Sequence, residues 1–348
     1  MKAALFIGLL LVVGFSGWYL LKKPAKSTDP EWSNLPAILS LDQRPQSRFL
    51  PTPENEIPAG KNAIYAPALL FAWNKIRQMI QAPIETNSRL STDFLLINNS
   101  RGFEKSLDST EYSANVSVEN GIIEASVLFN KTLPFTTVMH RWTESIRFGD
   151  SSIAVFGVDY PDQEVSDQLS VLYFKNEDLF MLRIQPKDST SEIILCKGMS
   201  KYNSLGNLQR EADSLIRLGQ EESGIASNRS LYSINKDDRI GIPVIRFNLA
   251  TRYNSLLEQT FLAGNKTFTI KEAYQRTALV LEEHGAVAES EALIAVDSAG
   301  AAVPELIKPK TLLFNKPFFL MIRKKTITAP YFMMWVNNAE LLAPYSSK

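Results

Sequence analysis

The sequence contains few residues that bind metals or carry redox chemistry: one cysteine, Cys196, and two histidines, His140 and His284. A single cysteine cannot form an internal disulfide, and no group of Cys and His residues has the spacing of a metal site. Cys196 follows the apolar run 193–195, so we predict a buried, unreactive thiol there. The sequence therefore predicts neither a metal site nor a cofactor.

The sequence also lacks a net charge, because 37 Lys and Arg residues balance 37 Asp and Glu residues. A protein that follows a phosphate backbone needs a basic surface, so we predict no nucleic-acid partner. The Gly-x-Ser-x-Gly, His-Glu-x-x-His, Walker and Gly-x-Gly-x-x-Gly motifs are absent as well. The acidic pairs at 237–238 and 282–283 are interpreted as solvated turns. We therefore predict that the protein is not an enzyme.

A long hydrophobic run is present at the N-terminus. Every residue from 3 to 21 is apolar, small or aromatic, and a helix of this length nearly spans the ~30 Å hydrocarbon core of a bilayer. Residues 1–23 are thus predicted to be a membrane anchor, with the remainder exported to the periplasm or the extracellular space. The alternative is a signal peptide cleaved before Gly17, which would leave a secreted protein. Lysines on both sides leave the orientation open.

Residues 24–60 are rich in proline and polar residues, a composition that excludes long helices and central strands. We predict a tether here, with an apolar stretch at 35–41 that forms a helical turn against the following domain. The domain itself is predicted to span 61–348, since 45% hydrophobic residues suffice for a large core.

Periodicity within residues 61–348 predicts a mixture of strands and helices. A short strand at 62–66 precedes a buried helix that runs from Leu69 to Ile80. β-favouring runs separated by turn residues follow at 122–129, 152–158, 170–174, 179–184 and 244–249. Helical spacing of apolar residues recurs at 203–222 and 253–261. The predicted fold class is α+β, with mixed and antiparallel sheets flanked by helices.

Two apolar runs near the C-terminus, 312–323 and 329–338, predict a buried β-hairpin. The first contains Phe-Asn-Lys-Pro-Phe before its apolar strand, and the second contains Pro-Tyr-Phe-Met followed by Val-Asn-Asn. In residues and spacing, this pair resembles the closing strands of serpins, the serine protease inhibitor superfamily.

Further segments resemble serpins in the same order along the chain. Residues 273–285 are similar to the strand that leads into the reactive loop, with Gly285 at the hinge glycine. Residue preference alone would make 271–296 a helix, and the resemblance overrides that reading. Residues 126–135 are similar to the central strand of the large sheet and its following turn, and 62–67 to the strand that enters the second helix.

The resemblance implies a protease inhibitor that presents residues 285–310 as a bait loop and inserts the cleaved loop into its large sheet. An inserted strand buries every second side chain. The hinge residues that the resemblance implies are Glu283, Gly285, Ala286, Ala288, Ser290 and Ala292. From Ala286 onward this set is small, whereas the intervening set contains the two glutamates Glu289 and Glu291.

The spacing of the family from the hinge glycine implies a reactive bond at Ala299–Gly300. Small residues on both sides suit an elastase-like or subtilisin-like serine protease as the target. Cleavage at 302–303 or at 308–309 remains open, although the proline at 309 disfavours the latter.

The sequence also departs from the family. Too few residues lie between 80 and 122 for the usual helices and strands, so we expect one strand at 94–103, one helix at 104–112 and no helix across the large sheet. Ala286 replaces the threonine common at the hinge. A non-inhibitory binding module with a serpin-like fold is therefore the alternative to an inhibitor.

Overall fold

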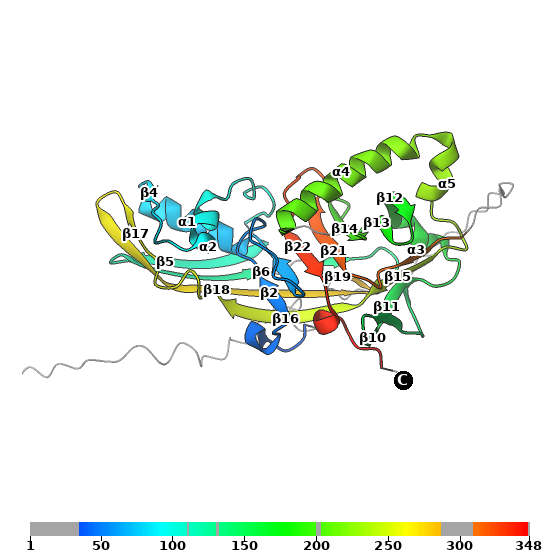
Figure 1. Ribbon diagram of the computed structural model, residues 1–348, viewed down its shortest axis with the longest axis horizontal. Coiled ribbons are helices and arrows are strands. Elements are labelled where there is room, and N and C mark those ends of the chain that lie inside the picture. The colour runs from blue at the N-terminus through cyan, green and yellow to red at the C-terminus, as the bar shows by residue number, and fades with distance from the viewer. Residues whose placement is uncertain (1–34, 110, 130–131, 200–202, 287–308, 347–348) are drawn as a thin grey trace, which may run out of the picture.

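The computed structural model describes residues 35–109, 111–129, 132–199, 203–286 and 309–346. A single strand, β18 (Lys266–Glu282), runs the length of the molecule over 17 residues (Figure 1). Its side chains alternate between the core and the opposite face, and Gln275, Thr277 and Leu281 are among those buried on the core side. Residue preference favours a helix over 271–296, and the prediction that a strand forms there instead is confirmed for residues 271–282, which lie in β18.

β18 organises a nine-stranded sheet, called the large sheet below. Strands β16 (Ile245–Arg252) and β17 (Thr260–Ala263) pair antiparallel with β18, and β6 (Ile122–Phe129) pairs parallel with it. β5 (Tyr112–Glu119) pairs with β6. The remaining strands of this sheet are β1 (Leu39–Ser40), β4 (Ile84–Glu85), β7 (Leu133–Pro134) and β19 (Gly285–Ala286).

β5 and β6 are joined by a tight turn at Asn120 and Gly121, whose φ angles are 51° and 77°. Two positive φ angles in a two-residue hairpin loop define a type I′ turn, which Asn-Gly favours. A Cβ at Gly121 would lie 2.5 Å from the carbonyl oxygen of Thr267, so only glycine fits. Since β6 follows β5 directly, no helix crosses the large sheet between them, as predicted.

A second, seven-stranded sheet contains the predicted C-terminal hairpin, in which β21 (Phe318–Lys324) pairs antiparallel with β22 (Phe332–Val336). β14 (Ser191–Lys197), the interior strand beside β21, is buried at all seven positions, including Cys196, which confirms the prediction of a buried thiol. The other strands are β12 (Leu169–Asn176), β13 (Leu179–Ile184), β3 (Asn62–Tyr65) and β2 (Ser47–Phe49).

Two smaller sheets lie at the end of the molecule that contains β19 (Figure 1). The four-stranded sheet has the order β20 (Thr311–Leu313), β15 (Arg239–Pro243), β11 (Val155–Val158) and β8 (His140–Arg141). A two-stranded sheet is formed by β9 (Ile146–Phe148) and β10 (Ser151–Ile153).

The helices are distributed over the two ends (Figure 1). α1 (Ala68–Ile80) and α2 (Thr92–Asn99) cover one end of the large sheet, and α4 (Leu205–Ser223) packs on β12 at the other end. The shorter helices are α3 (Gln163–Asp167), α5 (Arg229–Tyr232), η2 (Leu41–Gln43), η3 (Ala226–Asn228) and η4 (Ala339–Leu341). The strands and helices predicted at 62–66, 69–80, 122–129 and 203–222 are thus confirmed.

Three local predictions are wrong. Residues 94–103 form no strand; most of them belong to α2, because the Ser91 side chain accepts the N–H of Phe94 and caps a helix. Residues 104–109 and 111 form turns and bends rather than a helix, and Tyr112 begins β5. Residues 253–261 form turns and the start of β17, and Glu258 has a φ of 60°, which no helix accommodates.

The second half of the predicted tether is folded onto the domain. β1 pairs parallel with β16, β2 pairs parallel with β3, and the Asn248 side chain donates a hydrogen bond to the Pro36 carbonyl. The predicted turn at 35–41 is a short strand that leads into η2. Among the described residues, no helix is long and apolar enough to cross a membrane, and the predicted anchor at 3–21 lies outside them.

Candidate functional site

The candidate site is the hinge at the end of β18, where the chain reverses direction. After Glu282 the chain turns at Glu283 and His284 and returns as β19, antiparallel to β18. β19 also pairs antiparallel with β7, so these two residues form a short strand between β18 and β7. Farther along, β6 and β18 pair with each other directly. The large sheet is therefore open at the hinge, and the seam between β6 and β18 is closed from Thr269 to Thr277, where the two strands pair directly.

The hinge requires glycine at position 285. Gly285 has a φ of 130°, which L-residues rarely adopt. A Cβ there would lie 2.5 Å from the Leu133 carbonyl oxygen and 2.6 Å from the Pro134 Cα. β19 therefore fits between its neighbours only because residue 285 has no side chain.

Backbone hydrogen bonds and ion pairs hold the turn in place. The N–H of Phe135 donates to the His284 carbonyl at 3.0 Å, and the N–H of Met139 donates to the Glu283 carbonyl at 2.9 Å. The Glu283 carboxylate accepts from Arg141 at 2.7 Å, and its neighbour Glu282 pairs with an arginine of β16 at the same distance. Both arginines were missed by the sequence analysis.

β8, which provides Arg141, is itself braced by a histidine and an acidic side chain. His140 Nε2 lies 3.0 Å from Asp162 Oδ2, and His140 Nδ1 accepts the N–H of Asp159 at 3.4 Å. Because Nδ1 is the acceptor of the Asp159 N–H, Nε2 is the ring nitrogen that donates to Asp162. Burial alone would raise the pKa of Asp162. The hydrogen bonds from His140 and from the Val165 N–H together outweigh burial, so the pKa of Asp162 lies below its ordinary value.

The chain that follows the predicted bait loop is held at Lys310 by a buried ion pair. Lys310 Nζ lies 2.8 Å from Asp238 Oδ2, and the side chains are 5% and 0% exposed. The Lys310 N–H donates to Asp238 Oδ1 at 2.7 Å. Asp238 is therefore not part of a solvated turn, which corrects the sequence interpretation of 237–238. Since Lys310 directly precedes β20, the pair fixes the chain where the loop enters the four-stranded sheet.

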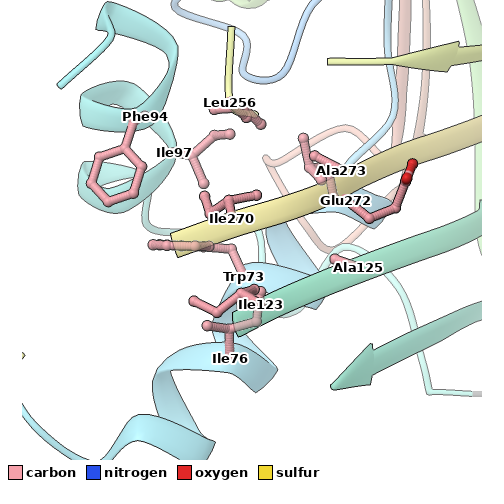
Figure 2. A pocket seen from close by; sticks show the side chains of 11 residues that line it. Trp73, Ile76, Phe94, Ile97, Ile123, Ala125, Leu256, Ile270, Glu272 and Ala273 are labelled. Atoms are coloured by element: carbon pink, nitrogen blue, oxygen red, sulfur yellow. The ribbon is translucent and has the colours of Figure 1, made fainter. Parts of the chain in front are cut away.

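A small apolar cavity of about 20 Å³ lies beneath the closed seam, where α1 and α2 cover β6 and β18 (Figure 2). Its lining includes Trp73, Ile97 and Ala125, and the Glu272 carboxylate points away toward Arg252. The cavity adjoins a register irregularity between Ile270 and Glu272 in the β6–β18 ladder. The space is too small and too apolar for a polar ligand.

The predicted site residues fall into two groups. Glu283, Gly285 and Ala286 lie together in the hinge, as the resemblance implied. Ala288, Ser290, Ala292, Ala299 and Gly300 lie outside the described residues. Among the described residues, no group of three or more His, Cys, Asp or Glu side chains could hold a metal ion.

The segments that resemble serpins occupy the places that the resemblance implies. The strand that leads into the loop is β18, it pairs with the predicted central strand β6, and the closing pair is the β21–β22 hairpin. The protein thus has a divergent serpin-like α+β fold.

No protein-family model and no curated protein matches the chain. Among solved structures, it is similar to a serpin from the trematode Schistosoma haematobium, with 12% identity, a TM-score of 0.43, and coverage of 80% of this chain and 94% of that chain. It is also similar to the thermophilic serpin tengpin in its native state, with 14% identity, a TM-score of 0.36 and coverage of 62% and 55%. Serpin48 of the insect Tenebrio molitor has 14% identity, a TM-score of 0.33 and coverage of 62% and 55%. The chain thus spans 55% of the length of the last two.

Proposed function

We propose that this protein is a membrane-tethered or exported inhibitor of a serine-type protease, and that residues 285–310 are its bait loop. The observation that carries the proposal is β19: the first residues after the hinge already form a strand of the large sheet, between β18 and β7. A loop cut by a protease would extend this strand along the seam. In the proposal, residues 3–21 hold the domain at a membrane.

The register of β19 supports insertion. Ala286 is opposite Leu281, which is fully buried, so the Ala286 side chain lies on the core face and is 1% exposed. Side chains alternate along a strand, so Ala288, Ser290 and Ala292 would follow on the same face. All three side chains are small enough to fit against the core face of the large sheet. Ser290 would come opposite the buried Thr277.

The same register places the glutamates on the face of the sheet opposite the core. Each step back along β18 from Glu282 matches one step forward along the loop from Gly285, so Glu291 would come opposite Arg276. The half-buried Arg276 side chain lies on the face opposite the core, where its Nε donates to Asn248 Oδ1 at 2.9 Å. An inserted strand would thus bring a carboxylate to a guanidinium rather than bury it unpaired.

The target class follows from the proposed reactive bond at Ala299–Gly300, because small residues suit the pocket of an elastase-like or subtilisin-like protease. The test is to incubate the full chain in detergent with elastase-like, subtilisin-like, chymotrypsin-like, trypsin-like and papain-like proteases. We expect an SDS-resistant adduct with a serine protease, with mass spectrometry locating the cut near Ala299.

A pair of adjacent substitutions sharpens this test. Ala288→Glu places a carboxylate on the core face of the inserted strand, where an unpaired charge costs several kcal/mol, whereas Val287→Glu places it on the opposite face, which already receives Glu289 and Glu291. We expect Ala288→Glu to be cleaved without adduct and Val287→Glu to keep forming the adduct. Equal adduct yields from the two variants would contradict insertion in this register.

A non-inhibitory binding module is the second candidate, favoured by the two-residue turn between β5 and β6, which leaves no room for a helix between these two strands. Clean cleavage by every protease of the panel, with no adduct, would support this reading instead.

A further inference from the structure

The outer edge of β5 is a second feature of the large sheet, separate from the hinge. Within the described residues, β5 pairs with β6 alone. The two-residue turn makes Glu119 and Ile122 a hydrogen-bonded closing pair, so the odd-numbered residues of β5 bond to β6. The N–H and C=O groups of Tyr112, Ala114, Val116 and Val118 therefore point outward.

This edge carries little of the protection that natural sheets use. Edge strands are usually guarded by proline, bulges or charged side chains, because their free backbone groups otherwise pair with another chain. β5 contains no proline and no lysine, and its pairing with β6 is regular along all eight residues. Lys75 of α1 reaches the edge, where its Nζ lies 3.4 Å from the Ala114 carbonyl oxygen. That lysine is an exposed side chain that can swing aside.

We propose that the β5 edge pairs antiparallel with the β5 edge of a second copy of this chain. The sequence of the strand is self-complementary about Asn115. With Asn115 opposite itself, the core face matches Tyr112 with Val118 and Ala114 with Val116, and the front face matches serine with serine. From 112 to 118 no charged residues are opposed, and every outward backbone group there finds a partner. Beyond this stretch, Glu119 comes opposite Glu111, whose carboxylate already lies 3.4 Å from Lys324 Nζ.

A two-residue slip would leave outward groups unpaired at the strand ends, and a one-residue slip would oppose core-face and front-face side chains. The two-fold axis at Asn115 is therefore the favoured register. The resulting interface is isologous and closed, so it produces a dimer in which the two large sheets are continuous.

The experiment is a register-specific disulfide. Asn115 is exposed on the front face, and Asn115→Cys brings two thiols directly opposite each other across the proposed axis. The native Cys196 is fully buried and does not compete. With the full chain in detergent under mild oxidation, we expect a disulfide-linked dimer on a non-reducing gel.

Ser113→Cys and Ser117→Cys are the matched controls. Each is opposite the other position in the second copy and lies too far from its own equivalent to be bridged, so each alone should crosslink at least ~10-fold more slowly than Asn115→Cys. A mixture of the two chains should restore fast crosslinking. Equal rates in all three single variants would indicate random collision and overturn the proposal, as would an Asn115→Cys chain that stays monomeric.

A second variant separates pairing from folding. The N–H of Ala114 points outward, so Ala114→Pro removes no hydrogen bond to β6 but removes one from the proposed interface. Placed in the Asn115→Cys chain, it should abolish the crosslink while the circular dichroism spectrum stays unchanged. Lys75→Ala, which clears the edge, should increase the crosslinking rate. A crosslink that survives Ala114→Pro in a folded chain would overturn the proposal. Protease adducts are measured separately, so failure here leaves the proposed inhibitory function untouched.

Discussion

The buried pair Lys310–Asp238 permits a quantitative prediction about the stability of the chain where it enters β20. Asp238 accepts three hydrogen bonds: one from Lys310 Nζ, one from the Lys310 N–H and one from the Asn235 N–H. Lys310 Nζ also donates to two backbone carbonyls, those of Ser230 and Ser233, at 3.2 and 2.8 Å. The pair thus ties β20 to the residues before β15.

Asp238→Ala leaves a buried ammonium without its counter-ion and two backbone N–H groups without acceptors. Removal of one partner from a buried ion pair costs about 3–5 kcal/mol, because the remaining charge stays desolvated. The free energy of unfolding should fall by that amount. Lys310→Met combined with Asp238→Asn removes both charges, and should recover more than half of the loss.

The assay is urea denaturation followed by circular dichroism, with an exposed pair as the control. Lys271 and Glu258 lie 2.7 Å apart at side-chain exposures of 44% and 69%, so Glu258→Ala should cost less than about 1 kcal/mol. If Asp238→Ala costs no more than Glu258→Ala, the argument from burial is refuted.

Three further predictions concern other parts of the fold. A Cβ at Gly219 of α4 would lie 1.8 Å from the Leu172 carbonyl oxygen, so Gly219→Ala should lower the free energy of unfolding by about 3 kcal/mol, measured by urea denaturation. Burial raises the pKa of the Cys196 thiol, so an aromatic disulfide reagent should react with it only in urea that unfolds the chain; reaction in the native state would contradict this. The pKa of Asp162 lies below its ordinary value of 3.8, so its stabilising effect is present above that pH and is lost as the pH falls through the lowered pKa. The difference in stability between wild type and Asp162→Asn should therefore shrink from pH 7 to pH 3, and a constant difference would speak against the role of His140 as its partner.

Where local pattern and fold agree, the sequence predicts the elements well. β6 begins and ends as predicted, because an Asn-Gly turn precedes it and its apolar residues alternate. α4 follows the helical spacing predicted at 203–222. β18 is different, since its alanines and glutamates favour a helix, and only the resemblance to serpins identified it as a strand. Burial between β16 and β6 determines its conformation.

The missed features depend on contacts between distant residues or on local signals that apolarity obscured. The apolar residues 94–97 suggested a strand, although Ser91 at the N-cap and Asp93 in the first turn are helix signals. Arg141 and Glu283 are separated by 142 residues, and Lys310 and Asp238 by 72, so no sequence pattern connects them. The hinge residues could be predicted because Gly285 comes at the end of a continuous segment, 273–285, that resembles a serpin strand, so no distant contact was needed to find it.

The energetics of the proposed insertion depend on the closed part of the seam. Between β19 and the cavity, β6 and β18 pair directly from Glu124–Glu272 to Phe129–Thr277. A strand that enters here breaks one ladder and forms two, and each additional hydrogen bond contributes about 1 kcal/mol net. That gain is offset by separating buried side chains of β6, such as Val127 and Phe129, from those of β18. β19 lowers the initial barrier, because the sheet is already open at its first two positions. The net free energy of insertion therefore depends on how far the buried side chains must separate, which is least when the core-face residues of the inserted strand are small. Ala288, Ser290 and Ala292, which follow Ala286 on this face, meet that condition.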